Sequence, residues 1–141
     1  MLGWIMSIIA GAVMSIQGVF NTRLSDKTGV FESNVIVQGT ALLIALLIWW
    51  IFGKGDIKAV TQVNKLYLTG GLLGSVITVT VMLGMKNLSP AYAVSIILVA
   101  QLLTAGIIDF FGLFGTEKIV FGARKIIGVI TMILGMLLFK L

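Results

Sequence analysis

Residues 41–48 read Ala-Leu-Leu-Ile-Ala-Leu-Leu-Ile, eight successive apolar residues with no polar residue between them. They lie inside a longer, mostly apolar stretch at about 32–52. A strand of a membrane barrel alternates apolar and polar residues, whereas a continuous apolar run of about 20 residues is long enough for a helix to cross the hydrocarbon core. The stretch therefore predicts a transmembrane helix and excludes a barrel strand.

Four further stretches of similar length have the same continuous apolar character. Polar residues separate them, and Ser89-Pro90 is a favourable helix start because serine caps a helix and proline is tolerated at its first position. We therefore predict an all-α membrane protein, a five-transmembrane-helix bundle that forms one transmembrane domain over residues 1–141. The predicted helices lie at about 2–22, 32–52, 66–86, 91–113 and 119–139.

The composition excludes a soluble enzyme. Hydrophobic residues make up 59% of the chain and charged residues only 11%, whereas about 25% is usual for soluble domains. The chain has no cysteine and no histidine, so the usual zinc ligands and several common nucleophiles are missing, and we predict neither catalysis nor a cofactor. Its ten basic residues are scattered between the apolar stretches, which favours a lipid bilayer over nucleic acid as the partner.

The basic residues also bear on orientation in the membrane. With five spans, the two ends lie on opposite sides, and six basic residues fall on the N-terminal side against four on the other. This difference weakly favours a cytoplasmic N-terminus. Two interpretations stay open, namely one fixed orientation, or dual topology in which copies insert both ways and pair antiparallel. The two groups are Lys54, Lys58, Lys65, Lys118, Arg124 and Lys125, and Arg23, Lys27, Lys86 and Lys140.

Amide side chains within the predicted spans are candidate ligand-binding groups. Gln17 and Asn21 are four residues apart and share one helix face, and Gln101 lies in the fourth predicted span. Amides both donate and accept hydrogen bonds, which suits a neutral or zwitterionic solute. Two roles stay open for these three residues, namely lining a cavity and hydrogen bonding between helices. The second span carries two further amides, Asn34 and Gln38, and for Asn34 hydrogen bonding between helices is favoured.

Asp109 is the one acidic residue within a predicted apolar span. It lies near the end of the fourth span, where it can pair with Arg124 or Lys125 at the start of the fifth. A static ion pair is the favoured interpretation, and a role in proton coupling is the alternative.

Small residues recur at spacings that let helices approach closely. We expect two stripes of this kind to serve helix packing, within one chain or between chains. The first lies on the predicted third helix and the second on the fifth: Gly70, Gly74 and Thr78, and Gly128, Thr131 and Gly135.

Two segments resemble a known family. Residues 11–21 read GAVMSIQGVFN, and residues 101–103 and 108–115 read QLL and IDFFGLFG. The chain resembles the YdcZ-type inner-membrane exporters, a half-size, five-helix branch of the drug/metabolite transporter superfamily. One departure is Phe110, where the family pattern leads us to expect a polar ring after the aspartate.

The resemblance implies a bundle like one half of the ten-helix transporters, which contain two inverted five-helix repeats. It implies a bacterial inner membrane and a dimer, either a homodimer, antiparallel in the dual-topology case, or a heterodimer with a related half. By analogy with larger relatives, Gln17, Asn21 and Gln101 line the central cavity.

The predicted function is that of a secondary transporter half, which exports a small metabolite or an amphipathic compound by alternating access. The alternative is a non-transporting assembly or regulatory subunit. A four-helix multidrug/proton exchanger is disfavoured, because the first span carries no acidic residue.

Overall fold

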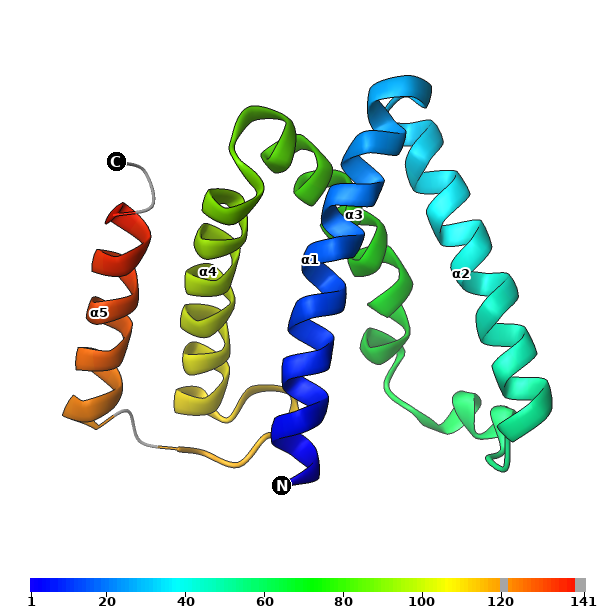
Figure 1. Ribbon diagram of the computed structural model, residues 1–141. Helices are drawn as coiled ribbons and strands as arrows, with labels where there is room; N and C mark the ends of the chain where they lie inside the picture. Colours follow the sequence, from blue (N-terminus) through cyan, green and yellow to red (C-terminus); the bar gives the residue numbers. More distant parts are fainter. Residues whose placement is uncertain (120–121, 139–141) are drawn as a thin grey trace. The chain divides into compact units, whose positions relative to one another are not determined.

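The computed structural model describes residues 1–119 and 122–138, which form helices and their connections (Figure 1). Three short 3₁₀ helices lie in the connections: η1 (Ile57–Gln62), η2 (Lys65–Thr69) and η3 (Leu113–Gly115). The prediction of an all-α protein is confirmed for these residues. The α-helices are α1 (Leu2–Thr28), α2 (Val30–Phe52), α3 (Gly70–Asn87), α4 (Pro90–Phe111) and α5 (Ala123–Leu138).

Four helical segments of the described chain are long and apolar enough to cross a membrane. The helix α5 has 16 residues, fewer than the roughly 20 that span the hydrocarbon core. The predicted fifth span also includes residues 120, 121 and 139, which lie outside the described residues, as does Lys140. Crossing by α5 therefore stays a prediction. The four segments are Leu2–Thr28, Val30–Phe52, Lys65–Asn87 and Pro90–Phe111.

The helix α1 continues to Thr28, beyond its predicted end near residue 22. Hydroxyl groups in its last turns bond back to the helix: Thr22 Oγ1 donates to the Gly18 carbonyl at 2.7 Å, and Ser25 Oγ donates to the Thr22 carbonyl at 2.8 Å. These bonds satisfy the hydroxyls without a partner outside the helix, so polar residues do not end it.

The first compact unit, Met1–Asn87, contains α1, α2 and α3, each of which packs against the other two. Its buried apolar side chains include Met82 and Met85 of α3. Gly18 of α1 allows this packing, because a Cβ added there would lie 2.7 Å from Met85 Cε. Methionine is unbranched and adapts to such an irregular gap.

The turn between α1 and α2 depends on Gly29. Its φ of 99° and ψ of 157° lie in a region that glycine alone adopts readily, and the Glu32 carboxylate occupies the space where a Cβ would stand. Across the turn, the Thr28 and Ser33 hydroxyls lie 2.7 Å apart, and Ser33 is fully buried. One residue thus reverses the chain between two membrane helices.

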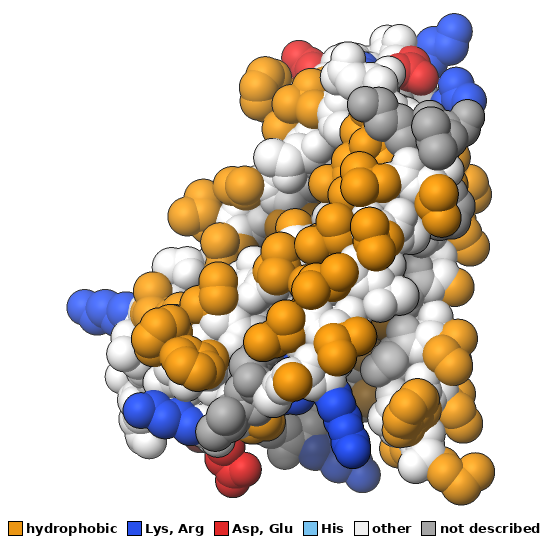
Figure 2. Space-filling model, turned by 90° about the vertical axis from the view of Figure 1, so that its left-hand side faces the viewer, with side chains coloured by type: hydrophobic (Ala, Val, Ile, Leu, Met, Phe, Trp, Pro, Cys, Tyr) orange, Lys and Arg blue, Asp and Glu red, His pale blue; other side chains and the backbone are white. Residues whose placement is uncertain are grey.

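The second unit, Leu88–Leu141, contains α4 and α5, which pack against each other. The predicted start of α4 is confirmed, since Pro90 is its first residue and Ser89 Oγ accepts a hydrogen bond from the Tyr92 backbone amide at 3.4 Å. Hydrophobic side chains are spread over the face shown in Figure 2. Leucine, isoleucine and phenylalanine side chains are widely exposed, as expected where lipid covers the helices.

Replacing Gly29 with alanine tests the turn. We expect G29A to lower the free energy of unfolding by about 1–3 kcal/mol, because alanine at this φ and ψ is strained. The measurement is equilibrium unfolding in detergent micelles. The control is G39A, since no atom lies within 4 Å of a Cβ added at Gly39. Equal stability of the two variants would contradict the role of Gly29.

Candidate functional site

A pocket of about 540 Å³ lies between α4 and α5, inside the second unit. Most of its wall is apolar or small, and includes Leu102, Gly106, Gly128 and Met132. Asp109 of α4 and Lys125 of α5 are its charged residues. A pocket of this volume is within the range that small-molecule sites occupy, about 300–1,000 Å³.

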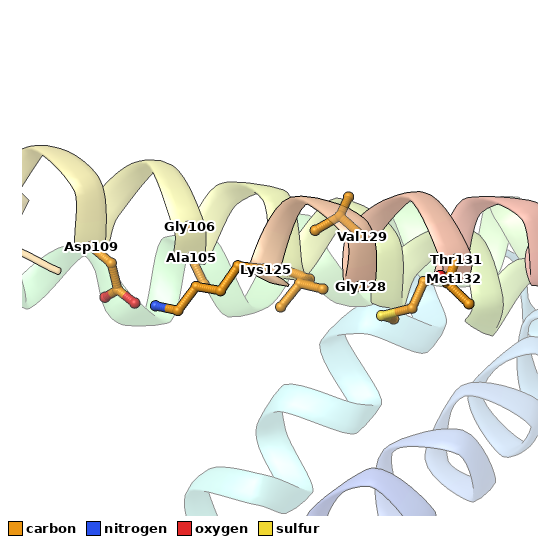
Figure 3. A pocket seen from close by; sticks show the side chains of 9 residues that line it. Ala105, Gly106, Asp109, Lys125, Gly128, Val129, Thr131 and Met132 are labelled. Carbon is orange, nitrogen blue, oxygen red and sulfur yellow. The ribbon is translucent and has the colours of Figure 1, made fainter. Parts of the chain in front are cut away.

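Asp109 and Lys125 lie at one end of this pocket, and their charged groups point toward one another (Figure 3). The sequence predicted that Asp109 pairs with Arg124 or Lys125, and of these two Lys125 lines the same pocket as Asp109. Arg124 is exposed and is not among the residues that line the pocket. An ion pair between Asp109 and Lys125 stays a prediction.

The first part of the connection after α4 is held close to Asp109. The helix ends at Phe111, and the residue that follows it, Gly112, has a left-handed φ of 64° and ψ of 40°. The Thr116 hydroxyl then donates to the Leu113 carbonyl at 2.9 Å, and the Ile119 amide donates to the Asp109 carbonyl at 2.9 Å. These bonds fasten the connection to the last turn of α4, beside Asp109.

The three amides predicted to line a cavity have no side-chain hydrogen bond within residues 1–119 and 122–138. Gln17 is exposed and Asn21 half-buried, one turn apart on α1 in the first unit. Gln101 is exposed on α4 in the second unit. The structure therefore brings Gln17 and Asn21 together, and a shared cavity with Gln101 stays a prediction.

Gln38, by contrast, joins two helices. Its Nε2 donates to Thr78 Oγ1 of α3 at 3.4 Å, and Thr78 Oγ1 donates to the Gly74 carbonyl at 2.9 Å. A Cβ added at Gly74 would lie 3.8 Å from Gln38 Nε2, so the small residue leaves room for the amide. Gly74 and Thr78 thus face α2, as helix packing requires.

Within the residues that the structure describes, the remaining small residues of the two predicted stripes, and Asn34, show no contact with another helix of the kind that Gln38 and Gly74 make. An added Cβ at Gly70, Gly128 or Gly135 would meet no atom within 4 Å, and Thr131 lines the pocket. The Asn34 Oδ1 atom is buried with no hydrogen-bond partner in the described part of the chain, so the expected interhelical bond is not seen at that atom.

A charged cluster at the end of α1 was not predicted from the sequence. Lys86 Nζ of α3 donates to the Ser25 carbonyl at 3.2 Å and lies 3.6 Å from Asp26 Oδ1. Arg23 Nη1 lies 3.8 Å from Asp26 Oδ2. Because a cation at a helix C-terminus satisfies free carbonyls, Lys86 joins the ends of α1 and α3. The sequence feature that could have predicted this cluster is the opposite charge of Asp26 and Lys86, which lie near the ends of the first and third predicted spans.

Comparison with known proteins identifies a family. The sequence model of the family described as "Putative inner membrane exporter, YdcZ" matches residues 2–138, nearly the whole chain. No curated protein and no solved structure matches the chain. The family and the apolar helices together make this a multi-pass inner membrane protein.

A double-mutant cycle tests the bond between α2 and α3. We expect Q38A and T78V to show a coupling energy of about 0.5–1.5 kcal/mol in unfolding, because each removes one partner of the same hydrogen bond. The control cycle pairs T78V with Q17A, and there the effects should add. Additive effects of Q38A and T78V would show that this hydrogen bond does not stabilise the helix pair.

Proposed function

Since the chain belongs to the YdcZ family of inner membrane exporters, we propose that it is one half of a secondary transporter. In this proposal it exports a small metabolite or an amphipathic compound by alternating access. The observation that carries the proposal is the set of amides on the spans whose side chains have no hydrogen bond to the described residues 1–119 and 122–138, namely Gln17, Asn21 and Gln101.

An amide that faces hydrocarbon without a hydrogen bond is costly, so these side chains require water, a solute or another chain. Gln38 differs from them, because its side chain already has a hydrogen-bond partner, Thr78, within the same unit. The contrast separates an amide that holds helices together from amides available to a solute. It supports Gln17 and Asn21 as cavity residues on α1, with Gln101 as their counterpart on α4.

We further propose that two copies, or this chain and a related half, form the working unit. Gln17, Gln101 and Gly70 are exposed in the single chain and Gly135 is half-buried, and a Cβ added at either glycine would meet no atom within 4 Å. A second half would cover such faces by close helix packing, as small residues allow. Gly70 and Gly135 are the residues we assign to that contact.

Export by cells that produce the chain tests the transport function. We expect a compound to accumulate in the medium, and Q17A or N21A to lower its rate of export about three- to tenfold, the effect of one lost hydrogen bond. Mass spectrometry of the medium measures this. The control is Q62A, an amide of the exposed segment η1. Unchanged export in both α1 variants would exclude the cavity assignment, and no export at all would favour the subunit alternative.

The oligomeric state is tested on the purified chain. We expect light scattering in detergent to give twice the chain mass of 15.1 kDa. The chain has no cysteine, so single introduced cysteines report unambiguously on contacts. Cross-linking between copies then distinguishes parallel from antiparallel pairing. A stable monomer that still exports would contradict the dimer.

A further inference from the structure

We propose that the pocket between α4 and α5 binds an amphipathic zwitterion, a molecule with an apolar chain and a head that carries one cationic and one anionic group. The inference rests on the proposed function, because it names the chemical class of the exported compound. Three features of the pocket support it: the two charged residues at one end, the apolar residues that line the rest, and the open space next to Gly128.

The charged end supplies one group of each sign. The Asp109 carboxylate and the Lys125 ammonium point toward one another at the same pocket wall, so the site is neutral as a pair (Figure 3). A ligand with a single charge would pair with one of them and leave the other without its partner. A zwitterionic head offers an opposite charge to both the half-buried Asp109 and the exposed Lys125, so each charge can be matched by the ligand.

The rest of the pocket is suited to a hydrocarbon chain. Leu102, Val129 and Met132 line it beyond the charged end, and Gly106 is buried in its wall. At Gly128, a Cβ would meet no atom within 4 Å, so the missing side chain leaves room in the pocket. Burial of an apolar chain here is favoured because it removes hydrocarbon surface from water.

A second hollow of similar volume shows what distinguishes this pocket. That hollow, of about 520 Å³, is lined by Gly3, Trp4, Ser7 and Ile8 of α1 alone. It has no charged residue and only one side-chain hydroxyl in its wall. Of the two, the α4–α5 pocket alone combines paired charges with an apolar length, which is the pattern that recognises an amphipathic zwitterion.

Three ligands with the same eight-carbon chain test the head-group preference. The purified full-length protein in a maltoside detergent is titrated with 2-aminooctanoate, octylamine and octanoate, and binding is measured by equilibrium dialysis against empty micelles. We expect 2-aminooctanoate to bind about tenfold more tightly than either of the others, because it alone matches both charges. Equal binding of octylamine or octanoate would overturn the proposal.

Charge-removing variants should change the preference and not merely weaken binding. We expect D109N to lose about tenfold in affinity for 2-aminooctanoate and to prefer octanoate, since Lys125 remains. K125Q should instead prefer octylamine, since Asp109 remains. A misfolded variant would lose all three ligands, so opposite preferences identify the two charges directly. Unchanged affinity for 2-aminooctanoate in both variants would overturn the site.

The apolar length is tested at Gly128. We expect G128L to weaken binding of 2-aminooctanoate about tenfold, because the leucine side chain fills space that the ligand chain would occupy. The matched control is G39L on α2, where an added Cβ also meets no atom within 4 Å and no pocket residue is changed. Equal affinity of G128L and the wild type, or an equal loss in G39L, would overturn this location.

These binding measurements need no transport and therefore separate the two proposals. A chain that binds 2-aminooctanoate with this selectivity but exports nothing would retain the site and contradict the transporter. A chain that exports a compound but does not bind 2-aminooctanoate would retain the transporter and overturn the zwitterion site.

Discussion

A peptide group in the hydrocarbon core must find its hydrogen bond within the protein, and the structure follows from this constraint. The backbone satisfies it in four long apolar helices, and the hydroxyls satisfy it by bonding to their own helix, as Thr22, Thr40 and Thr80 do. Within residues 1–119 and 122–138, the amide side chains of Gln17, Asn21 and Gln101 have no such bond. The remaining amides and charges are therefore the places where another molecule can contribute binding energy.

The same constraint explains why the helices were predictable. A continuous apolar run such as residues 41–48 permits only a helix in the membrane. The pair Ser89-Pro90 indicates the start of α4, because serine caps a helix and proline is tolerated at its first position. The continuation of α1 to Thr28 was not predictable from polarity, because hydroxyls that bond to their own carbonyls cost the helix little and look like a boundary in the sequence. The 16 residues described in α5 begin with a polar turn, which leaves a shorter apolar length than the other helices have.

The candidate site was predictable in kind but not in detail. The sequence places Asp109 near the end of one span and two basic residues at the start of the next, which predicts an ion pair. It does not choose between Arg124 and Lys125, which are adjacent and point about 100° apart around the helix. Which of them lines the pocket depends on the rotation of α5 about its own axis, which the sequence pattern does not contain. Spacing likewise could not separate Gly74, which faces Gln38, from Gly70, which faces open space.

Polar groups in this chain therefore divide according to where their partners are. Gln38 and Lys86 have partners on another helix of the same unit, and these contacts hold α1, α2 and α3 together. Gln17 and Asn21 have no such partner, and burying them against lipid would oppose insertion. A subunit that needed only stability would gain by replacing these amides with leucine. The proposed transport function gives these amides a physical role, because an amide on a solute-filled path gains hydrogen bonds that the protein itself does not supply.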